Sequence, residues 1–225
     1  MTDYHLIRSK RKTIAIHITK DAAVEVRAPL KVPKSEIDRF VASKQEWIDT
    51  HLALRKQSVQ NKSAFQLNYS DTLLLQGHAY PITAKVGNRV GFDGESFFMP
   101  PGLSTDEIKH AVIQIYKMVA KNVLTHKVLD YAKQMDVTPT AIKVNGAKTR
   151  WGSCSGKNSL NFSWLLIMAD DGVIDYVVVH ELAHIKEHNH SHKFWAVVAD
   201  ILPDYKQRQS KLKQLQKRLI NEDWD

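Results

Sequence analysis

The feature that most constrains this chain is the run Val177–Trp195, whose sequence is VVVHELAHIKEHNHSHKFW. Within it, His180, Glu181 and His184 form the pattern H-E-x-x-H inside an almost continuous apolar stretch, which predicts a buried helix. Residues four apart share one face of a helix, so both imidazole rings can converge on a single metal ion. Glu181 stands beside that face, where a carboxylate can accept a proton from a metal-activated water. Because such side chains are costly to bury unless paired or metal-bound, this setting favours a metal site over a solvated helix face.

A catalytic zinc ion usually takes three protein ligands and leaves the fourth position for water, so a third ligand is needed. If the helix simply continued, His188 would share the face of the first two histidines, but eight residues rise about 12 Å along a helix, too far for convergence. Asn189 favours the end of a helix, and Ser191 is a good N-cap for another. A turn there would return His190 toward the ion, and we predict His190 as the third ligand. Two alternatives for this position are Glu187 and His192.

Four motifs occur in a fixed order in the second half of the chain: R-W-G-S-C-S, L-N-F-S-W, H-E-L-A-H and N-H-S-H-K-F-W. Together they resemble the YgjP-like family of bacterial zinc metallohydrolases, which is related to SprT-like and gluzincin-type metalloproteases. The first half resembles that family only in its general layout. The resemblance implies that His180, His184 and His190 are zinc ligands and that Glu181 is the general base. Metzincins also place a third histidine six residues after the second, but they require glycine at the position held here by Glu187.

The first hundred residues read as a β-rich unit crossed by one helix. Apolar and polar residues alternate in two segments of Tyr4–Pro29, with a hairpin turn at Lys20–Asp21 between them, which predicts short strands. A helix is predicted over residues 34–57 from helical spacing of apolar residues, and the polar segment Ser58–Ser70 is typical of a linker. Strands are predicted again over Leu73–Pro100. We therefore predict a first domain over residues 1–100.

Residues 101–225 are predicted to form a zincin-like metallohydrolase domain, so the fold class is α+β. Its expected back is a long helix over Thr105–Met135, along which apolar residues trace a stripe. A small sheet and the H-E-x-x-H helix follow, and a basic amphipathic helix after Pro203 completes the domain. The expected strands of the small sheet are Ala141–Asn145, Lys148–Ser153 and Ser159–Leu166.

Candidate substrate-binding residues lie close to the H-E-x-x-H helix in the sequence. In gluzincin-like proteases the strand before this helix is a sheet edge that pairs with an extended substrate. By that analogy Asn161 and Trp164 are predicted cleft residues; a core position for Trp164 and a local hydrogen bond for Asn161 are the alternatives. Arg150 and Tyr176 could donate to an oxyanion, with an ordinary structural hydrogen bond as the alternative for each.

Charge and cysteine usage bear on partners and location. Lys and Arg number 32 against 24 Asp and Glu, a net charge of +8. A basic field attracts anions without sequence preference, so weak non-specific nucleic-acid binding is one expectation, and solvated helix faces are the alternative. The single cysteine, Cys154, excludes an intramolecular disulfide, and we interpret it as a small packed residue. With no secretory segment and no apolar run of about 20 residues, we expect a cytoplasmic protein without membrane contact.

Three functions are compatible with these features. The first is a metallopeptidase with one zinc ion per chain, acting on a peptide or protein. The second is a nucleoside triphosphate pyrophosphatase or phosphohydrolase, because a zinc hydroxide can also attack phosphorus; the lack of a Gly-rich phosphate loop weakens it. The third is a nucleic-acid-associated module with a non-catalytic metal, although structural zinc sites usually have four ligands and are rich in Cys.

Overall fold

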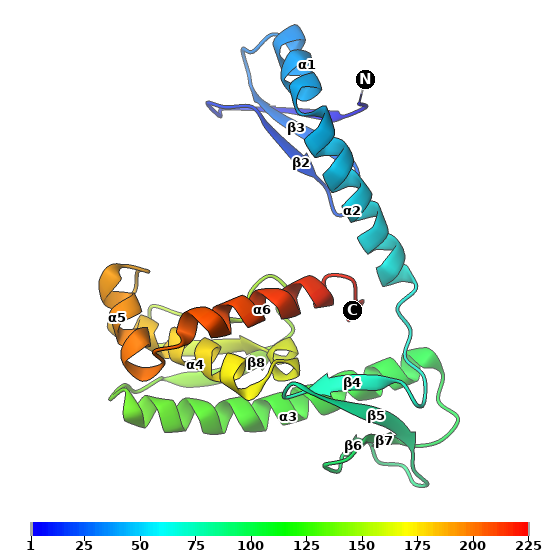
Figure 1. The fold of residues 1–225 in the computed structure, drawn as a ribbon, viewed down its shortest axis with the longest axis vertical. Helices are drawn as coiled ribbons and strands as arrows, with labels where there is room; N and C mark the ends of the chain where they lie inside the picture. Colours follow the sequence, from blue (N-terminus) through cyan, green and yellow to red (C-terminus); the bar gives the residue numbers. More distant parts are fainter. Residues whose placement is uncertain (1, 225) are drawn as a thin grey trace. The chain divides into compact units, whose positions relative to one another are not determined.

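The computed structural model describes residues 2–224, which group into two compact units (Figure 1). The first unit comprises the residues up to Phe65 together with Arg218–Asp223. The second comprises Gln66–Lys217 and Trp224. The division between the units thus lies directly after Phe65. The sequence predicts a domain boundary after residue 100. The strands between these two positions belong to the second unit. The two predicted domains stay a prediction.

The first unit is built on a small sheet with strand order β1-β3-β2. Strand β3 is central, parallel to β1 and antiparallel to β2, so the predicted hairpin is confirmed. Alternate residues of β3 are buried, as the period of two in a strand requires when one face is covered. Its strands are β1 (His5–Ser9), β2 (Ala15–Ile18) and β3 (Val24–Pro29).

Two helices cover this sheet where the sequence predicts one helix over residues 34–57. Helix α1 (Lys34–Ser43) has its C-cap at Lys44, and α2 (Gln45–Ser63) follows directly. The second helix runs beyond the predicted end, into the segment interpreted as a linker. Ser58 on that extension is buried and donates a hydrogen bond to the carbonyl of Ile220 at 3.0 Å. A contact with a residue so distant in the sequence cannot be inferred from local periodicity.

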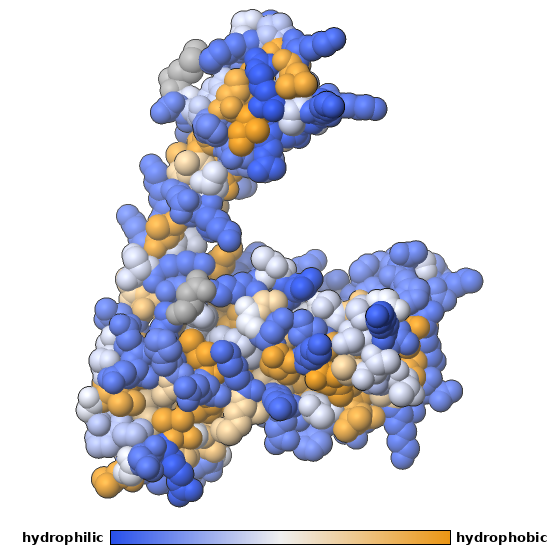
Figure 2. All heavy atoms as spheres, turned by 180° about the vertical axis from the view of Figure 1, so that it is seen from behind, coloured by the Kyte–Doolittle hydropathy of each residue, from blue (hydrophilic) through white to orange (hydrophobic). Residues whose placement is uncertain are grey.

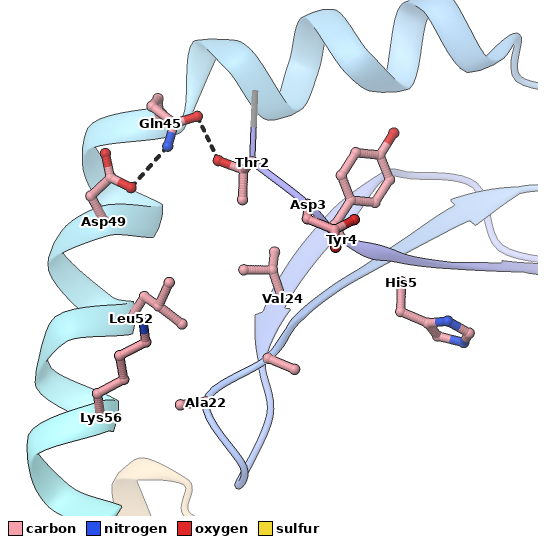
Figure 3. A pocket seen from close by; sticks show the side chains of 11 residues that line it. Thr2, Asp3, Tyr4, His5, Ala22, Val24, Gln45, Asp49, Leu52 and Lys56 are labelled. Atoms are coloured by element: carbon pink, nitrogen blue, oxygen red, sulfur yellow. Dashed lines mark hydrogen bonds between the residues drawn. The ribbon is translucent and has the colours of Figure 1, made fainter.

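An open hollow of about 790 Å³ lies in the first unit between the start of β1, the β2–β3 turn and α2 (Figure 3). Thr2 Oγ1 donates to Gln45 Oε1 at 2.6 Å, and Gln45 Nε2 donates to Asp49 Oδ1 at 2.8 Å along one wall. Val24 and Leu52 contribute apolar surface to it. None of the predicted metal or substrate residues lines this hollow.

The second unit begins with a sheet of strand order β4-β5-β7-β6. Gln76 and Gly77 form the predicted turn between β4 and β5, with φ values of 49° and 80°. A Cβ on Gly77 would lie 2.9 Å from the Cα of Asp170, so this turn packs closely against the segment that begins the H-E-x-x-H helix. The strands are β4 (Thr72–Leu75), β5 (His78–Ala84), β6 (Gly91–Phe92) and β7 (Phe97–Met99).

The long helix predicted over Thr105–Met135 is present as α3 (Thr105–Gln134). Ser104 and Glu107 form a capping box at its start, which satisfies backbone N–H groups that have no partner within the helix. Its buried face packs against the H-E-x-x-H helix, against the 3₁₀ helix η1 (Trp164–Met168) and against the following sheet. Helix α3 therefore forms the back of this unit, as predicted.

The sheet behind the metal-binding motif has strand order β8-β10-β9. Strand β8 (Ala141–Asn145) is parallel to β10 (Ser159–Ser163), and β9 (Gly152–Cys154) is antiparallel to it. The interpretation of β10 as a sheet edge is therefore wrong, because it has a neighbour on each side. The physical reason is that β8, which follows α3, returns to pair on the side of β10 that the β9–β10 hairpin leaves open. Strand β10 also ends earlier than predicted, where η1 begins.

Three helices complete the second unit, and charged residues tie the first of them to α3 and the last of them to the first. Asp170 caps the H-E-x-x-H helix, with its Oδ1 accepting from the N–H of Val173 at 2.9 Å. Asp175 binds Lys127 of α3 at 2.8 Å, and Arg208 Nη1 donates to the carbonyl of Gly172 at 3.0 Å. The helices are α4 (Asp171–Lys186), α5 (His192–Ile201) and α6 (Tyr205–Leu219).

The surface is mainly hydrophilic on the face drawn in Figure 2, with scattered apolar side chains. Scattered exposure of this kind is normal for a folded protein surface. Across residues 2–224, no helix combines the length and the apolar character that crossing a membrane requires. The large apolar side chains with the greatest exposure are Val86, Leu54, Leu30 and Met118.

Candidate metal centre

Helix α4 presents His180 and His184 on one face and buries most of the rest of its surface. The ring centroids of the two histidines lie 5.0 Å apart, as expected for residues one helical turn apart. Apolar residues on both sides of them are buried, which fixes the rotation of the helix against the unit. The buried residues of α4 around the motif are Val177, Val178, Val179, Leu182 and Ala183.

A tight turn after α4 brings a third histidine to the first two. The helix ends at Lys186, and Ser191 caps α5 with its Oγ accepting from the N–H of Phe194 at 3.4 Å. Between these helices, the exposed His190 places its Nε2 at 3.0 Å from Nε2 of His180. Its ring centroid lies 4.7 Å from that of His184. The structure therefore brings together the three histidines that the sequence analysis selected.

The cluster of His180, His184 and His190 fits a metal ion. Ring nitrogens of all three lie within 4.8 Å of one another, and three nitrogen donors leave one position open, as catalytic zinc sites do. Metal binding requires neutral imidazoles. Burial, followed by the effects of His184 and His190, lowers the pKa of His180 to about 3. Burial also lowers the pKa of His184, so both helical histidines are neutral at pH 7.

The predicted alternatives for the third ligand lie outside this cluster. Among residues 2–224, no other His, Cys, Asp or Glu side chain joins the three histidines in a group that could hold one metal ion. His188 and His192 are exposed. The backbone carbonyl of Glu187 is 3.3 Å from Nδ1 of His184, an arrangement that can orient the ring of a metal ligand.

Glu181 is a buried carboxylate beside the cluster, with a relative exposure of 6%. Burial raises its pKa to about 7, against the opposing effect of the Arg150 guanidinium. A bound cation would lower this pKa, because an opposite charge favours the carboxylate. A carboxyl group in this position can accept a proton and return it, which suits a general base.

Gly152 on β9 makes room for Glu181, a role that the sequence analysis missed. A Cβ built on Gly152 would lie 2.6 Å from both Cγ and Oε1 of Glu181, closer than real Cβ contacts allow. Glycine is the residue that lets the strand backbone approach the carboxylate this closely. Its position within R-W-G-S-C-S was the available signal, but only the structure shows what the glycine faces.

Phe194 on α5 is a second residue beside the cluster that sequence reasoning missed. Its ring is fully buried, and its centroid lies between 4.6 and 4.9 Å from those of all three histidines. It therefore packs against the whole cluster and restricts the ring positions. The available signal was an aromatic residue in the N-H-S-H-K-F-W motif, which by itself predicts no contact with the histidines.

Arg150 and Tyr176, the predicted oxyanion donors, differ in environment. Arg150 is exposed and close enough to Glu181 to affect its pKa. Tyr176 is buried, and its ring centroid lies 5.8 Å from that of His180. Gln209 Nε2 donates to the Tyr176 hydroxyl at 3.2 Å, and burial raises the pKa of that hydroxyl. Tyr176 thus belongs to the motif helix itself, and Arg150 lies near it.

The predicted cleft residues Trp164 and Asn161 differ in environment. Trp164 is 3% exposed and stacks on Tyr116 with centroids 5.7 Å apart, which is a core position. Asn161 lies on the central strand β10 opposite Ser153, and its Oδ1 is buried without a hydrogen-bond partner among the described residues. Cys154 is partly buried, and burial, followed by the charge of Glu181, raises the pKa of its thiol.

A match to a protein-family model decides which family the chain belongs to. The model described as a YgjP-like metallopeptidase domain matches residues 12–215. The chain belongs to the YgjP-like family. The resemblance seen in the sequence is thereby confirmed, as is the α+β fold class with a zincin-like unit. Membership makes the chain a metallohydrolase, and the matched range includes residues of both compact units.

Comparison with solved structures found partial similarities. The metallopeptidase zymogen jannalysin of Methanocaldococcus jannaschii is 23% identical, with 42% of this chain and 95% of that chain covered and a TM-score of 0.37. The metallopeptidase zymogen abylysin of Pyrococcus abyssi is 18% identical, with 46% of this chain and 98% of that chain covered and the same TM-score. No significant match was found among curated proteins.

Proposed function

We propose that this YgjP-like chain is a zinc-dependent metallopeptidase in which His180, His184 and His190 hold one zinc ion and Glu181 is the general base. The observation that carries the proposal is the convergence of three imidazoles beside a buried carboxylate. When bound, zinc supplies Lewis-acid activation of a water and of the scissile carbonyl. Because His180 and His184 are neutral, each has a ring nitrogen whose lone pair is available to bind the metal ion.

Glu181 is the residue we assign to proton transfer. An Oε atom accepts a proton from the attacking water, and the same carboxyl group then returns it to the leaving amine nitrogen. Its burial excludes bulk water, and the backbone at Gly152 holds the side chain from the strand side. The exposed guanidinium of Arg150 and the hydroxyl of Tyr176 are the candidate donors to the developing oxyanion.

Strand β9 is an edge strand beside the Glu181 carboxylate, and an extended peptide substrate could pair with it. Strand β9 pairs with β10 on one side, and no strand among the described residues pairs with its other side. Because β9 also carries Gly152 next to Glu181, a peptide added along its outer edge would pass the proposed general base. We therefore assign substrate pairing to β9 in place of β10, and we do not retain Trp164 as a cleft residue.

The nucleotide and nucleic-acid alternatives receive no support from the family comparison. The basic charge that suggested them is partly used in ion pairs of the second unit, such as Lys127 with Asp175 and Arg208 with Asp204. The identity of the metal as zinc and the cytoplasmic location stay predictions.

The test combines metal content with a substrate panel. Protein purified without added metal or chelator should contain about one zinc per chain, and that protein should cleave members of a peptide library. The same preparation should leave nucleoside triphosphates intact. A zinc-loaded protein that hydrolyses nucleotides but none of the peptides would overturn the peptidase assignment, and a folded protein that takes up no zinc would overturn the metal site.

A further inference from the structure

His190 differs from the other two histidines in how it is held. His180 and His184 project from a buried helix, whereas His190 is exposed in the turn between α4 and α5. A metal-binding histidine usually donates its other ring N–H to a carbonyl or carboxylate, which fixes the ring. His184 has such a partner in the carbonyl of Glu187, but the hydrogen-bond contact of His190 within residues 2–224 is with His180.

Aromatic stacking takes the place of that hydrogen bond. The indole of Trp195 lies against the His190 ring with centroids 5.7 Å apart and planes inclined by 28°. Trp195 in turn stacks on Tyr205, with centroids 5.2 Å apart and planes inclined by 15°. The three rings form a ladder that begins at the predicted ligand. Trp195 also approaches His180, but with planes inclined by 58°, so the nearly parallel face is offered to His190.

The far end of the ladder is fixed to the helix that carries the other two ligands. Tyr205 is the first residue of α6, and one turn later Arg208 Nη1 donates to the carbonyl of Gly172 on α4 at 3.0 Å. Arg208 also pairs with Asp175 of α4 at 3.6 Å. The contacts therefore run without a break from α4 to α6, from Tyr205 of α6 to Trp195, from Trp195 to His190, and from His190 back to His180 on α4. This continuous set of contacts restricts the turn that carries His190.

We propose that Trp195 is a positioning residue for the metal site: supported by Tyr205, its indole fixes the ring plane of His190 and so raises the affinity of the three histidines for zinc. This inference rests on the metal site of the proposed function. Trp195 is only partly buried, unlike the fully buried Phe194, so its side chain can be shortened with less disturbance of the core. It touches a ligand and acts through that ligand.

The first test measures zinc dissociation constants by competition with a chromogenic chelator. Trp195→Ala should bind zinc roughly 10- to 100-fold more weakly than wild type, the loss typical of removing a residue that orients a metal ligand. Trp195→Phe keeps a ring for stacking and should recover most of the affinity. Tyr205→Ala should weaken binding in the same direction but less. Trp47→Ala is the matched control, because Trp47 stacks on His51 in the first unit, and its zinc affinity should equal that of wild type.

The second test asks whether Trp195 acts through His190. In a His190→Ala background, Trp195→Ala should cause little further loss of affinity, since the ligand it orients is gone. The absorption spectrum of the cobalt-substituted protein should change shape in Trp195→Ala and approach that of wild type in Trp195→Phe. A general structural role would not give this pattern, and thermal unfolding of the metal-free variants identifies any loss of folding.

The outcomes separate this inference from the proposed function. A wild-type protein that binds no zinc would overturn both. Tight zinc binding by wild type together with unchanged affinity in Trp195→Ala and Tyr205→Ala would overturn the positioning role alone. An equal loss with and without His190 would also overturn it, as would a change confined to KM for peptides, which would make Trp195 a substrate contact.

Discussion

The Nε2 atoms of His180 and His190 lie 3.0 Å apart, although one belongs to a buried helix and the other to an exposed turn. Two imidazoles at this distance can share one proton in a hydrogen bond or share one cation. The presence of His184 within the same 4.8 Å group favours the cation, because a third donor then gains a role. This relationship links a local helical motif to a turn ten residues away.

Removing the third imidazole should weaken metal binding. His190→Ala leaves two nitrogen donors, so its zinc affinity should fall by more than the roughly 10- to 100-fold caused by losing an outer contact. The measurement is the zinc dissociation constant by chelator competition. His192→Ala removes an exposed histidine outside the cluster and should bind as wild type does. Equal affinity in the two variants would exclude His190 as a ligand.

Neutralising the buried carboxylate should separate metal binding from hydrolysis. Glu181→Gln keeps the shape of the side chain but cannot accept a proton, so kcat should fall by on the order of 10²- to 10⁴-fold while zinc content stays the same. Peptide turnover and metal content measured on one preparation test this. Glu187→Gln, a change at the partly buried C-cap of α4, is the control and should keep its activity. Normal turnover in Glu181→Gln would remove that residue from the mechanism.

A single methyl group on β9 should reduce catalysis without removing the metal. In Gly152→Ala the new Cβ would overlap the Glu181 side chain and displace its carboxylate, so kcat should fall by on the order of 10²-fold with zinc retained. Gly156→Ala is a matched control in the turn of the same hairpin, because a Cβ there meets no atom within 4 Å. If both variants have wild-type kcat, Glu181 does not depend on the space at Gly152.

Alkaline pH should destabilise the second unit through Tyr131. Burial, followed by the charge of Asp175 and a hydrogen bond to it, raises the pKa of Tyr131 from 10.0 to about 12. Because the folded state favours the neutral phenol, this contribution to the free energy of unfolding is fully present below pH 10. It is lost as the pH rises from 10 to about 12.

Denaturant unfolding of wild type and Tyr131→Phe at a series of pH values tests this prediction. The free energy of unfolding of Tyr131→Phe should decline less steeply than that of wild type between pH 10 and pH 12. A difference spectrum at the absorption band of tyrosinate should show one fewer late-titrating tyrosine in Tyr131→Phe than in wild type. Parallel declines in both proteins would show that Tyr131 titrates normally.

The sequence alone determined the local parts of this protein. The spacing of His180 and His184 places both on one face of any helix, and the Asp170 and Ser191 caps define where α4 and α5 begin. The length of α3 follows from its apolar stripe and its capping box. These features depend on residues close together in the chain, whose geometry is set by helix periodicity and backbone hydrogen bonding.

Only the tertiary structure decided what lies around the motif. The central position of β10 depends on β8 pairing across the sheet, and the space for Glu181 depends on Gly152 lying opposite α4. The stacking of His190, Trp195 and Tyr205 likewise depends on how α6 returns to α4. Such contacts join residues far apart in the sequence, and packing among several elements selects them. No local pattern records that selection.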